Sequence, residues 1–546
     1  MMFGILLSRL LGFVRDRIIS HRFGQGFETD VYNAAFTLPD LFFFLLAGGA
    51  LSGAFIPVFT EYYTLGKKQE AWRIFSAVAV IMTLVMSVLS ILGVIFAPQL
   101  VILTNPGYMP QMPHGFFQSI GWIISHTIHH DLVLSQKAQM TVNLTRILLP
   151  AQICFLLGGL MMGTLNAQNK FQGQAYGPVI YNIGIIFGGL VLSQFMGVAG
   201  LCWGALGGAI VGNLIYQWVL VRKSGGVFVV KNLRTHMKLP GVKKIWKLMI
   251  PVIFGLSLPY VSTIIGRSLA SDFSDGAQSA LMNANRLMQL PLGIFAQSTA
   301  IALFPTMSAL AAQKDIAGLQ RTACYGVRSI LFMTVPSSFL MIVLAMPIVQ
   351  LLLQSGKFTT SDAELAAQVL CWFSLGIFAW SAHAILTRGF YALQETHTPI
   401  IVGTVVTFIF IPLCFPLKHL FGVNGLALAT SIAATIHMLS MLVLLRKRLN
   451  GLDDAVLLRS TVKIVGASGI TAVACYGVRE FVNTVCFQFP MPIFMRTGIV
   501  LSTCLSISGL VYAMLAVSWQ MEEFKPIQNK LRSLLKKFTK KGIAPA

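Results

Sequence analysis

The chain has 546 residues, of which 55% are hydrophobic and only 11% are charged. Soluble globular proteins carry about 25% charged residues, so this composition excludes an ordinary soluble enzyme. The formal net charge of +22 comes mostly from short links between apolar runs. This placement argues against nucleic-acid binding and is typical of the charge bias that orients membrane proteins.

About fourteen apolar segments follow one another along the chain, and most can cross a bilayer as a helix of about 20 residues. We therefore expect an all-α polytopic membrane protein. The first segment is not expected to be a cleavable signal peptide, because arginines interrupt it. The segments cover residues 3–23, 31–60, 75–104, 143–166, 177–196, 199–221, 245–270, 278–311, 326–353, 364–391, 399–417, 423–445, 461–482 and 491–519.

Lys and Arg are concentrated in alternate links between these segments and in the tail after Trp519, whereas the opposite links nearly lack them. Because positively charged loops stay in the cytoplasm, both termini are predicted to be cytoplasmic. The eight cysteines are scattered, mostly within apolar runs and without a CxxC pair, so we expect neither a disulfide framework nor a zinc site.

Two short motifs recur six segments apart. FIPVF at 55–59 is echoed by LFPTM at 303–307, and NAQNKFQGQAYGP, ending at Pro178, by YALQETHTP, ending at Pro399. An even number of spans between the echoes predicts two six-helix lobes related by a pseudo-two-fold axis along the membrane normal, with the substrate path between them. The predicted parts are a first lobe at 1–222, a basic linker at 223–244, a second lobe at 245–448, two further helices at 449–520 and a basic tail at 521–546.

The link at about 105–141 is long, and its apolar residues follow a helical period, so we expect a short interfacial helix there. His126 and His130 are four residues apart and have a spacing that metal ligands use. No partner motif supports a metal site, so a solvated polar helix face is the preferred interpretation and no metal ion or cofactor is expected.

The first apolar segment, SRLLGFVRDRIISHRFG, contains an unusual run of charges: Arg9, Arg15, Asp16, Arg17 and Arg22. An arginine at mid-bilayer costs about 2.5–3.5 kcal/mol on insertion scales, so several of them are not expected to face lipid. Arginine binds phosphate through a planar, permanently charged fork. The segment therefore predicts an anionic substrate, and the alternative is a basic helix at the membrane interface.

Arg286, in NANRLMQLPLG of the eighth segment, is a second candidate, with interfacial snorkelling as its alternative. The sequence carries no phosphate-binding loop, paired catalytic carboxylates or Ser-His-Asp setting. A transporter is therefore expected, not an enzyme.

Several motifs resemble the MurJ/MviN lipid II flippases of the multidrug/oligosaccharidyl-lipid/polysaccharide exporter superfamily. The resemblance extends from residue 8 to about residue 450 and becomes looser beyond. It rests on SRLLGFVRDRIISHRFG with TDVYNAAFTLPDL, GAFIPVFTEY, NPGY, GTLNAQNKF, ANRLMQLPLG, LLQSGKFT and GFYALQETHTP.

The resemblance implies that the chain flips undecaprenyl-pyrophosphoryl disaccharide pentapeptide (lipid II) from the inner to the outer leaflet of the bacterial cytoplasmic membrane by alternating access. It places the family's functional arginines on Arg9, Arg15 and Arg286 and its acids on Asp16 and Asp30. It also implies a groove for the lipid tail on helices thirteen and fourteen, and cell-wall synthesis proteins as further partners.

The chain departs from the family pattern at Phe43, where an arginine is common, and Arg17 or Arg22 would then supply the missing charge. Three other functions stay open: a flippase for another polyprenyl-linked glycan, a small-molecule antiporter of the same superfamily, and a membrane scaffold without transport. An antiporter of cationic drugs needs buried acids, whereas buried arginines dominate here.

Overall fold

The computed structural model describes residues 2–48, 50–109, 111–112, 116–128, 132–168, 170–229, 233–487, 491–526 and 528–529. These residues form helices and contain no β-strand, which confirms the predicted all-α class. The chain divides into two compact units, of which the first holds Met1–Met282 with Leu352–Asp362 and the second Asn283–Leu351 with Ala363–Ala546. The predicted lobe boundaries at 222 and 245 stay a prediction.

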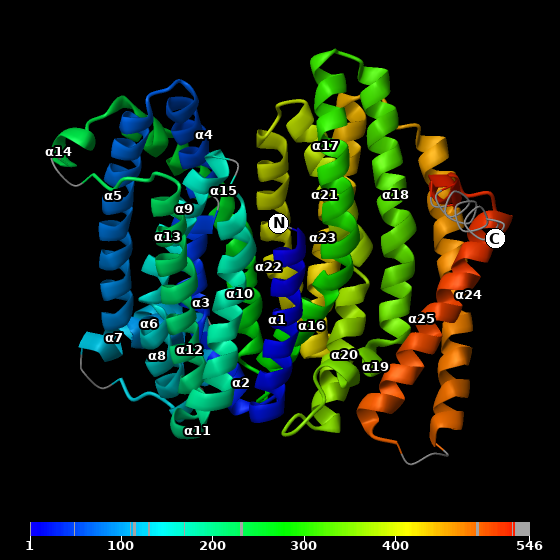
Figure 1. The fold of residues 1–546 in the computed structure, drawn as a ribbon. Coiled ribbons are helices and arrows are strands. Elements are labelled where there is room, and N and C mark those ends of the chain that lie inside the picture. The colour runs from blue at the N-terminus through cyan, green and yellow to red at the C-terminus, as the bar shows by residue number, and fades with distance from the viewer. Residues whose placement is uncertain are drawn as a thin grey trace, which may run out of the picture. The chain divides into compact units, whose positions relative to one another are not determined.

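The first unit consists of helices joined mostly by short links (Figure 1). They are α1 (Met2–Phe23), α2 (Phe27–Ala35), α3 (Thr37–Phe43), η1 (Phe44–Gly48), α4 (Ala50–Thr64), α5 (Lys68–Ile95), α6 (Ala97–Thr104), η2 (Pro106–Tyr108), α7 (Phe116–Ile128), α8 (Gln136–Leu148), α9 (Ala151–Ala167), α10 (Gln172–Phe187), η3 (Gly188–Leu192), α11 (Ser193–Met196), α12 (Ala199–Ala209), η4 (Ile210–Ile215), α13 (Tyr216–Lys223), α14 (Leu233–His236), α15 (Pro240–Ala270) and the start of α16 (Ala277–Pro291).

The second unit contains the rest of α16 and a run of long helices that ends at the last two, α24 and α25. Its elements are η5 (Leu292–Ala296), α17 (Gln297–Ala312), α18 (Ile316–Val343), α19 (Ala345–Leu352), α20 (Thr360–Ser374), α21 (Ile377–Ala392), α22 (His397–Phe421), α23 (Val423–Arg448), α24 (Asp454–Phe487), α25 (Ile493–Ser518) and η6 (Glu522–Phe524).

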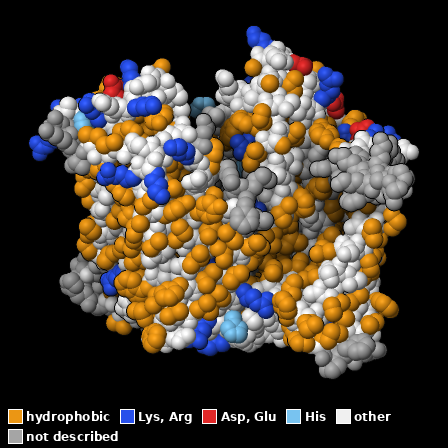
Figure 2. All heavy atoms as spheres, in the orientation of Figure 1, with side chains coloured by type: hydrophobic (Ala, Val, Ile, Leu, Met, Phe, Trp, Pro, Cys, Tyr) orange, Lys and Arg blue, Asp and Glu red, His pale blue; other side chains and the backbone are white. Residues whose placement is uncertain are grey.

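Within the described residues, ten helices are long and apolar enough to cross a membrane, and α20 with α21, bent by 42°, makes an eleventh if the pair is one span. The three remaining predicted segments are also helical, as α1, as the run from α2 to α4 and as α15. Apolar side chains cover the middle of each unit on the visible face, while Lys and Arg gather toward the ends (Figure 2). The chain is therefore a multi-pass membrane protein, and fourteen spans stays a prediction.

Small residues let two helices of the first unit touch through their backbones. A Cβ added to Gly184 of α10 would lie 2.6 Å from the carbonyl oxygen of Gly204 in α12, and one on Gly188 would lie 2.4 Å from that of Gly200. Glycine at a four-residue spacing permits such close approach between membrane helices. This contact fixes α10, which in turn packs along α1 and its arginines.

In the second unit, α24 packs along α18 and beside α25 (Figure 1). A buried apolar cluster of Leu344, Cys475, Val500, Leu501 and Cys504 joins these helices. Arg328 of α18 adds charged contacts to η6, directly after α25. Its Nη2 donates to Glu522 over 2.9 Å and its Nε donates to Glu523 over 2.6 Å. The last two helices are thus attached to their unit at both apolar and charged contacts.

The short helix predicted in the 105–141 link is present as α7. The ring of His126 stacks on that of Trp122 at a centroid distance of 3.9 Å, one turn earlier in the same helix. His129, His130 and Asp131 lie outside the described residues. Among the residues that are described, no group of three potential metal ligands occurs.

Candidate site for an anionic substrate

Arg15 is held in one orientation by two neighbours in the first unit. Its Nε and Nη2 donate to the same Asp16 oxygen over 3.0 and 2.9 Å, and its Nη1 donates to Oδ1 of Asn182 over 3.0 Å. Asn182 lies on α10 and its Nδ2 donates back to the carbonyl oxygen of Ser8 over 3.2 Å. The guanidinium therefore bridges α1 and α10 and has little freedom to turn.

This orientation leaves part of Arg15 open for a ligand. A guanidinium has five N–H groups. The hydrogen bonds of Arg15 within the described chain use one each on Nε, Nη1 and Nη2. The side chains of Arg15 and Asp16 are 21% and 12% exposed, so both are partly accessible. A fixed, partly open guanidinium can bind an oxygen of phosphate by a charge-assisted hydrogen bond.

The other arginines of α1 differ in exposure. Arg9 and Arg22 are exposed and have no ion-pair partner in the described part of the chain, whereas Arg17 is half-buried. Arg15 and Arg22 are seven residues apart and so share one helix face, because a helix has 3.6 residues per turn. The four arginines and one aspartate give α1 a net positive charge.

Arg286 lies on the part of α16 that belongs to the second unit, and its side chain is half-buried. It is flanked by Asn285, whose side-chain oxygen accepts a hydrogen bond from Gln289 over 2.6 Å. Arg286 and the arginines of α1 therefore belong to different units.

Asp30 has a different environment from the arginines, because it is only 1% exposed and both its oxygens are engaged. Oδ1 accepts from the backbone N–H and the hydroxyl of Ser279 over 2.9 and 2.7 Å. Oδ2 accepts from the N–H of Gly276 over 2.8 Å and from Lys137 over 3.1 Å. Ser279 and Gly276 lie at the start of α16, so Asp30 caps that helix from a distant part of the chain.

The NPGY motif at 105–108 packs against the same corner between α15 and α16. Gly107 donates its N–H to the hydroxyl of Ser271 over 3.0 Å, and a Cβ on Gly107 would lie 2.2 Å from the Ser271 carbonyl oxygen. Gln278 donates to the side-chain oxygen of Asn105 over 2.9 Å and bonds to the hydroxyl of Tyr108. The motif therefore has a structural explanation. No pattern in the sequence indicated that Gln278 and Ser271 are its partners.

The LLQSGKFT motif meets the end of α1 within the first unit. The N–H of Lys357 donates to the carbonyl oxygen of His21 over 2.9 Å. Gly356 has φ +58°, and a Cβ there would lie 2.2 Å from the same oxygen. Only glycine fits this position, which combines a left-handed backbone with close approach.

Phe43 lies in an apolar setting. Its ring packs edge-on against Phe44 and Phe155, with centroid distances of 5.9 Å in both pairs. On the preceding turn, Asp40 pairs with Arg267 of α15 at 3.5 Å. Compensation for Phe43 by Arg17 or Arg22 stays a prediction.

A multi-pass helical fold whose first helix carries partly exposed charged side chains is typical of membrane transporters. The fold is shared with a solved structure described as "Lipid II flippase MurJ, inward closed conformation", at a TM-score of 0.73 and 24% identity over 95% of this chain and 98% of that one. An inward-facing multidrug resistance MATE transporter of the MOP superfamily follows, at a TM-score of 0.63 and 15% identity over 82% and 96% of the two chains.

The sequence matches the family described as "Lipid II flippase MurJ" over residues 19–496, and the chain belongs to this family. A probable lipid II flippase MurJ of Rickettsia prowazekii is 30% identical over 435 residues, 78% of this chain and 79% of the relative. The corresponding protein of Vibrio cholerae is 28% identical and covers 79% of both chains. The predicted family is therefore confirmed.

Proposed function

We propose that this protein carries lipid II from the inner to the outer leaflet of the bacterial cytoplasmic membrane by alternating access, as a step of cell-wall synthesis. Membership of the family and the names of its relatives support the substrate. The observation that carries the proposal is Arg15, fixed between Asp16 and Asn182 with N–H groups to spare.

The pyrophosphate is the part of such a substrate that is hardest to move. Its charges lose water as it leaves the aqueous phase, and an unpaired buried charge is very costly. Arg15 replaces that water with hydrogen bonds whose direction is already set, so little ordering remains to be done when the ligand arrives. Asp16 orients the fork and neutralises only one of the cationic groups of α1.

Further ligands are proposed on the sequence argument alone. Arg9 would meet the pyrophosphate beside Arg15, Arg17 and Arg22 would add charge along α1, and Arg286 would contribute from the second lobe. Asp30 would act indirectly, by holding the start of α16. The prenyl tail would follow a groove on α24 and α25, with both chain termini in the cytoplasm.

Rescue of cells depleted of their lipid II flippase tests the proposal, combined with a direct assay of lipid II on the outer leaflet. Arg15→Ala should abolish rescue and flipping while the protein still inserts. Arg15→Lys keeps the charge but loses the fork, so partial activity is expected. Asn182→Ala is the matched control, because it removes the same link between α1 and α10 without removing a charge.

Normal flipping by correctly inserted Arg15→Ala would refute the assigned role of Arg15. Loss of flipping in Asn182→Ala as severe as in Arg15→Ala would also contradict it, since helix anchoring would then explain both variants. Failure of the correctly inserted wild-type protein to rescue such cells, with no lipid II on the outer leaflet, would instead favour another polyprenyl-linked glycan as the substrate.

A further inference from the structure

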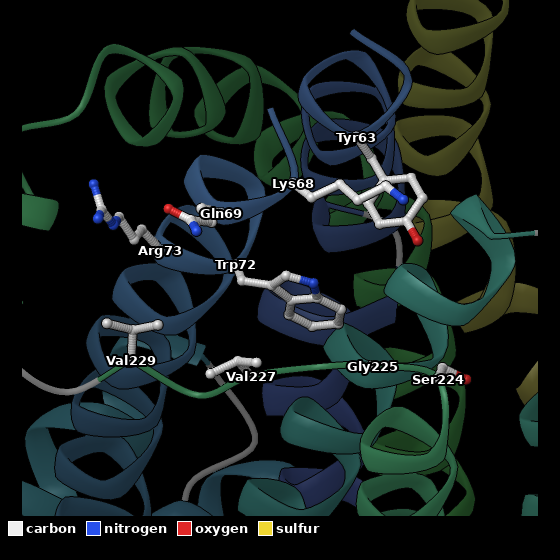
Figure 3. A pocket seen from close by; sticks show the side chains of 9 residues that line it. All are labelled: Tyr63, Lys68, Gln69, Trp72, Arg73, Ser224, Gly225, Val227 and Val229. Atoms are coloured by element: carbon white, nitrogen blue, oxygen red, sulfur yellow. The ribbon is translucent and has the colours of Figure 1, made fainter. Parts of the chain in front are cut away.

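A cavity of about 470 Å³ lies in the first unit, away from the arginines of α1. Its walls are the end of α4, the start of α5 and the segment that follows α13 (Figure 3). The lining includes two cationic residues, Lys68 and Arg73, and no acidic one. None of the residues proposed to bind the transported lipid lines this cavity.

The cavity is built around Trp72, which is only 5% exposed. Its ring packs edge-on against Phe59 and Phe75 at 5.3 and 5.4 Å. On the opposite wall, a Cβ on Gly226 would lie 2.9 Å from the indole, so glycine allows the segment to pass close by. The N–H of Val229 donates to the hydroxyl of Ser76 over 2.8 Å and fixes that segment to α5.

Hydrogen-bond donors in this cavity remain unused. The indole N–H of Trp72 has no acceptor among the described residues, although its side chain is almost fully buried and lies at the centre of the lining (Figure 3). The Lys68 ammonium lies 5.5 Å from the centre of the Tyr63 ring, and Arg73 is exposed without an ion-pair partner in the described part. Two cations and an indole N–H without an acceptor are groups that can bind a phosphate.

The position of the cavity along α5 indicates where that phosphate comes from. The helix has 28 residues, whereas about 20 suffice to cross the hydrocarbon core, and Lys68 and Arg73 lie in its first two turns. Further along, Leu84, Val88 and Ile91 are 58%, 54% and 58% exposed, which suits contact with acyl chains. The cationic end of a lipid-facing helix lies at the depth of the phospholipid head groups.

We propose that this cavity binds the head group of an anionic phospholipid. Lys68 and Arg73 meet the phosphate, and the indole N–H of Trp72 donates to one of its oxygens. The rings of Tyr63 and Trp72 line the space for the glycerol, and the acyl chains lie along the exposed face of α5. The site is separate from the substrate arginines and does not depend on the identity of the transported lipid.

Binding of fluorescent phosphatidylglycerol to the purified full-length protein in detergent tests the proposal. The double variant Lys68→Gln with Arg73→Gln should lower the affinity roughly 25-fold, from about fivefold for each charge near a membrane surface. Trp72→Phe keeps the aromatic packing but removes the N–H, and should lower the affinity about tenfold. The control Lys238→Gln with Lys243→Gln removes two exposed charges of the same unit outside the cavity, and should leave affinity unchanged.

Two results would overturn the proposal. One is equal binding of phosphatidylglycerol and phosphatidylcholine, or equal losses in the cavity variant and the control, because either would mean non-specific attraction. The other is complete displacement of the labelled lipid by inorganic phosphate or glycerol 3-phosphate at comparable concentration, because the cavity would then be a site for a soluble phosphate. Selective loss in Trp72→Phe, with the control unaffected, supports the site.

Discussion

Replacement of Asp30 by asparagine should destabilise the first unit, because an amide cannot reproduce all contacts of the carboxylate. Asparagine keeps one oxygen for the N–H and hydroxyl of Ser279, but its NH₂ group then faces the N–H of Gly276 and the ammonium of Lys137. Breaking a buried ion pair costs about 3–5 kcal/mol. Lys137 retains Asp275 at 2.7 Å, so we expect a smaller loss of about 2–3 kcal/mol.

Thermal unfolding of the purified protein in detergent measures this loss. With an unfolding entropy of about 2.1 cal/mol/K per residue, a unit of roughly 290 residues shifts by about 1.6 °C per kcal/mol. The unfolding temperature should therefore fall by roughly 3–5 °C. Asp275→Asn is the matched control, since it removes the other carboxylate from Lys137. Asp275 is 56% exposed, and exposed ion pairs contribute only about 0–1 kcal/mol.

An Asp30→Asn protein that unfolds at the wild-type temperature would refute the capping role. Equal destabilisation by Asp275→Asn would also contradict it, because Lys137 and not the start of α16 would then be the important partner. If Asp30→Asn is destabilised and also fails to flip lipid II, restoring its stability with a low assay temperature should recover activity.

Three further outcomes follow from local geometry and topology. Gly356→Ala should destabilise the end of α1 by at least about 1 kcal/mol, because of backbone strain. Gly207→Ala is the control and should not destabilise the protein, because its Cβ would meet nothing within 4 Å. The unfolding temperatures of the two variants test this difference. The hydrogen bond from Arg328 lowers the pKa of Glu522 below its ordinary value. The pair therefore contributes its full stability above the unfolded-state pKa of about 4.3. This contribution is lost as the pH falls through the lower pKa that Glu522 has in the folded protein. Glu522→Gln should flatten the dependence of unfolding temperature on pH over that range, and an unchanged slope would contradict the pairing. Cysteines placed at residues 235 and 540 should be shielded from an impermeant external reagent while one at residue 118 reacts; labelling at all three would refute the predicted topology.

The helical class was predictable because apolar runs of membrane length have few alternatives in a bilayer. The charged run of the first segment could be singled out as a candidate site, because Arg15 and Asp16 are costly in an apolar helix unless they have a function or a partner. The structure pairs these two residues with each other at 2.9 Å. Asn182 was not anticipated, because a single amide in an apolar run has no period or motif that marks its partner.

Contacts between distant segments could not be predicted from local patterns. Asp30 and Ser279 are 249 residues apart, and the assignment of 352–362 to the first unit depends on a turn that fits against His21. The sequence patterns also did not predict the π-helical turns η1, η3, η4 and η5. One extra residue per turn does not change the hydropathy of a segment, so only the hydrogen-bond pattern reveals it.

The contrast between Asp30 and Arg15 separates two uses of charge in an apolar protein. Asp30 is closed: its oxygens are saturated by four donors, and little of the side chain is accessible. Arg15 is open: it is oriented by an acid and an amide, yet it keeps donors and a fifth of its side chain exposed. A saturated charge stabilises one arrangement of helices, whereas an oriented but unsaturated one has binding energy left for a ligand. Substitutions at the two residues should therefore have different effects. Substitution of Asp30 should lower the stability of the protein, whereas substitution of Arg15 should abolish transport.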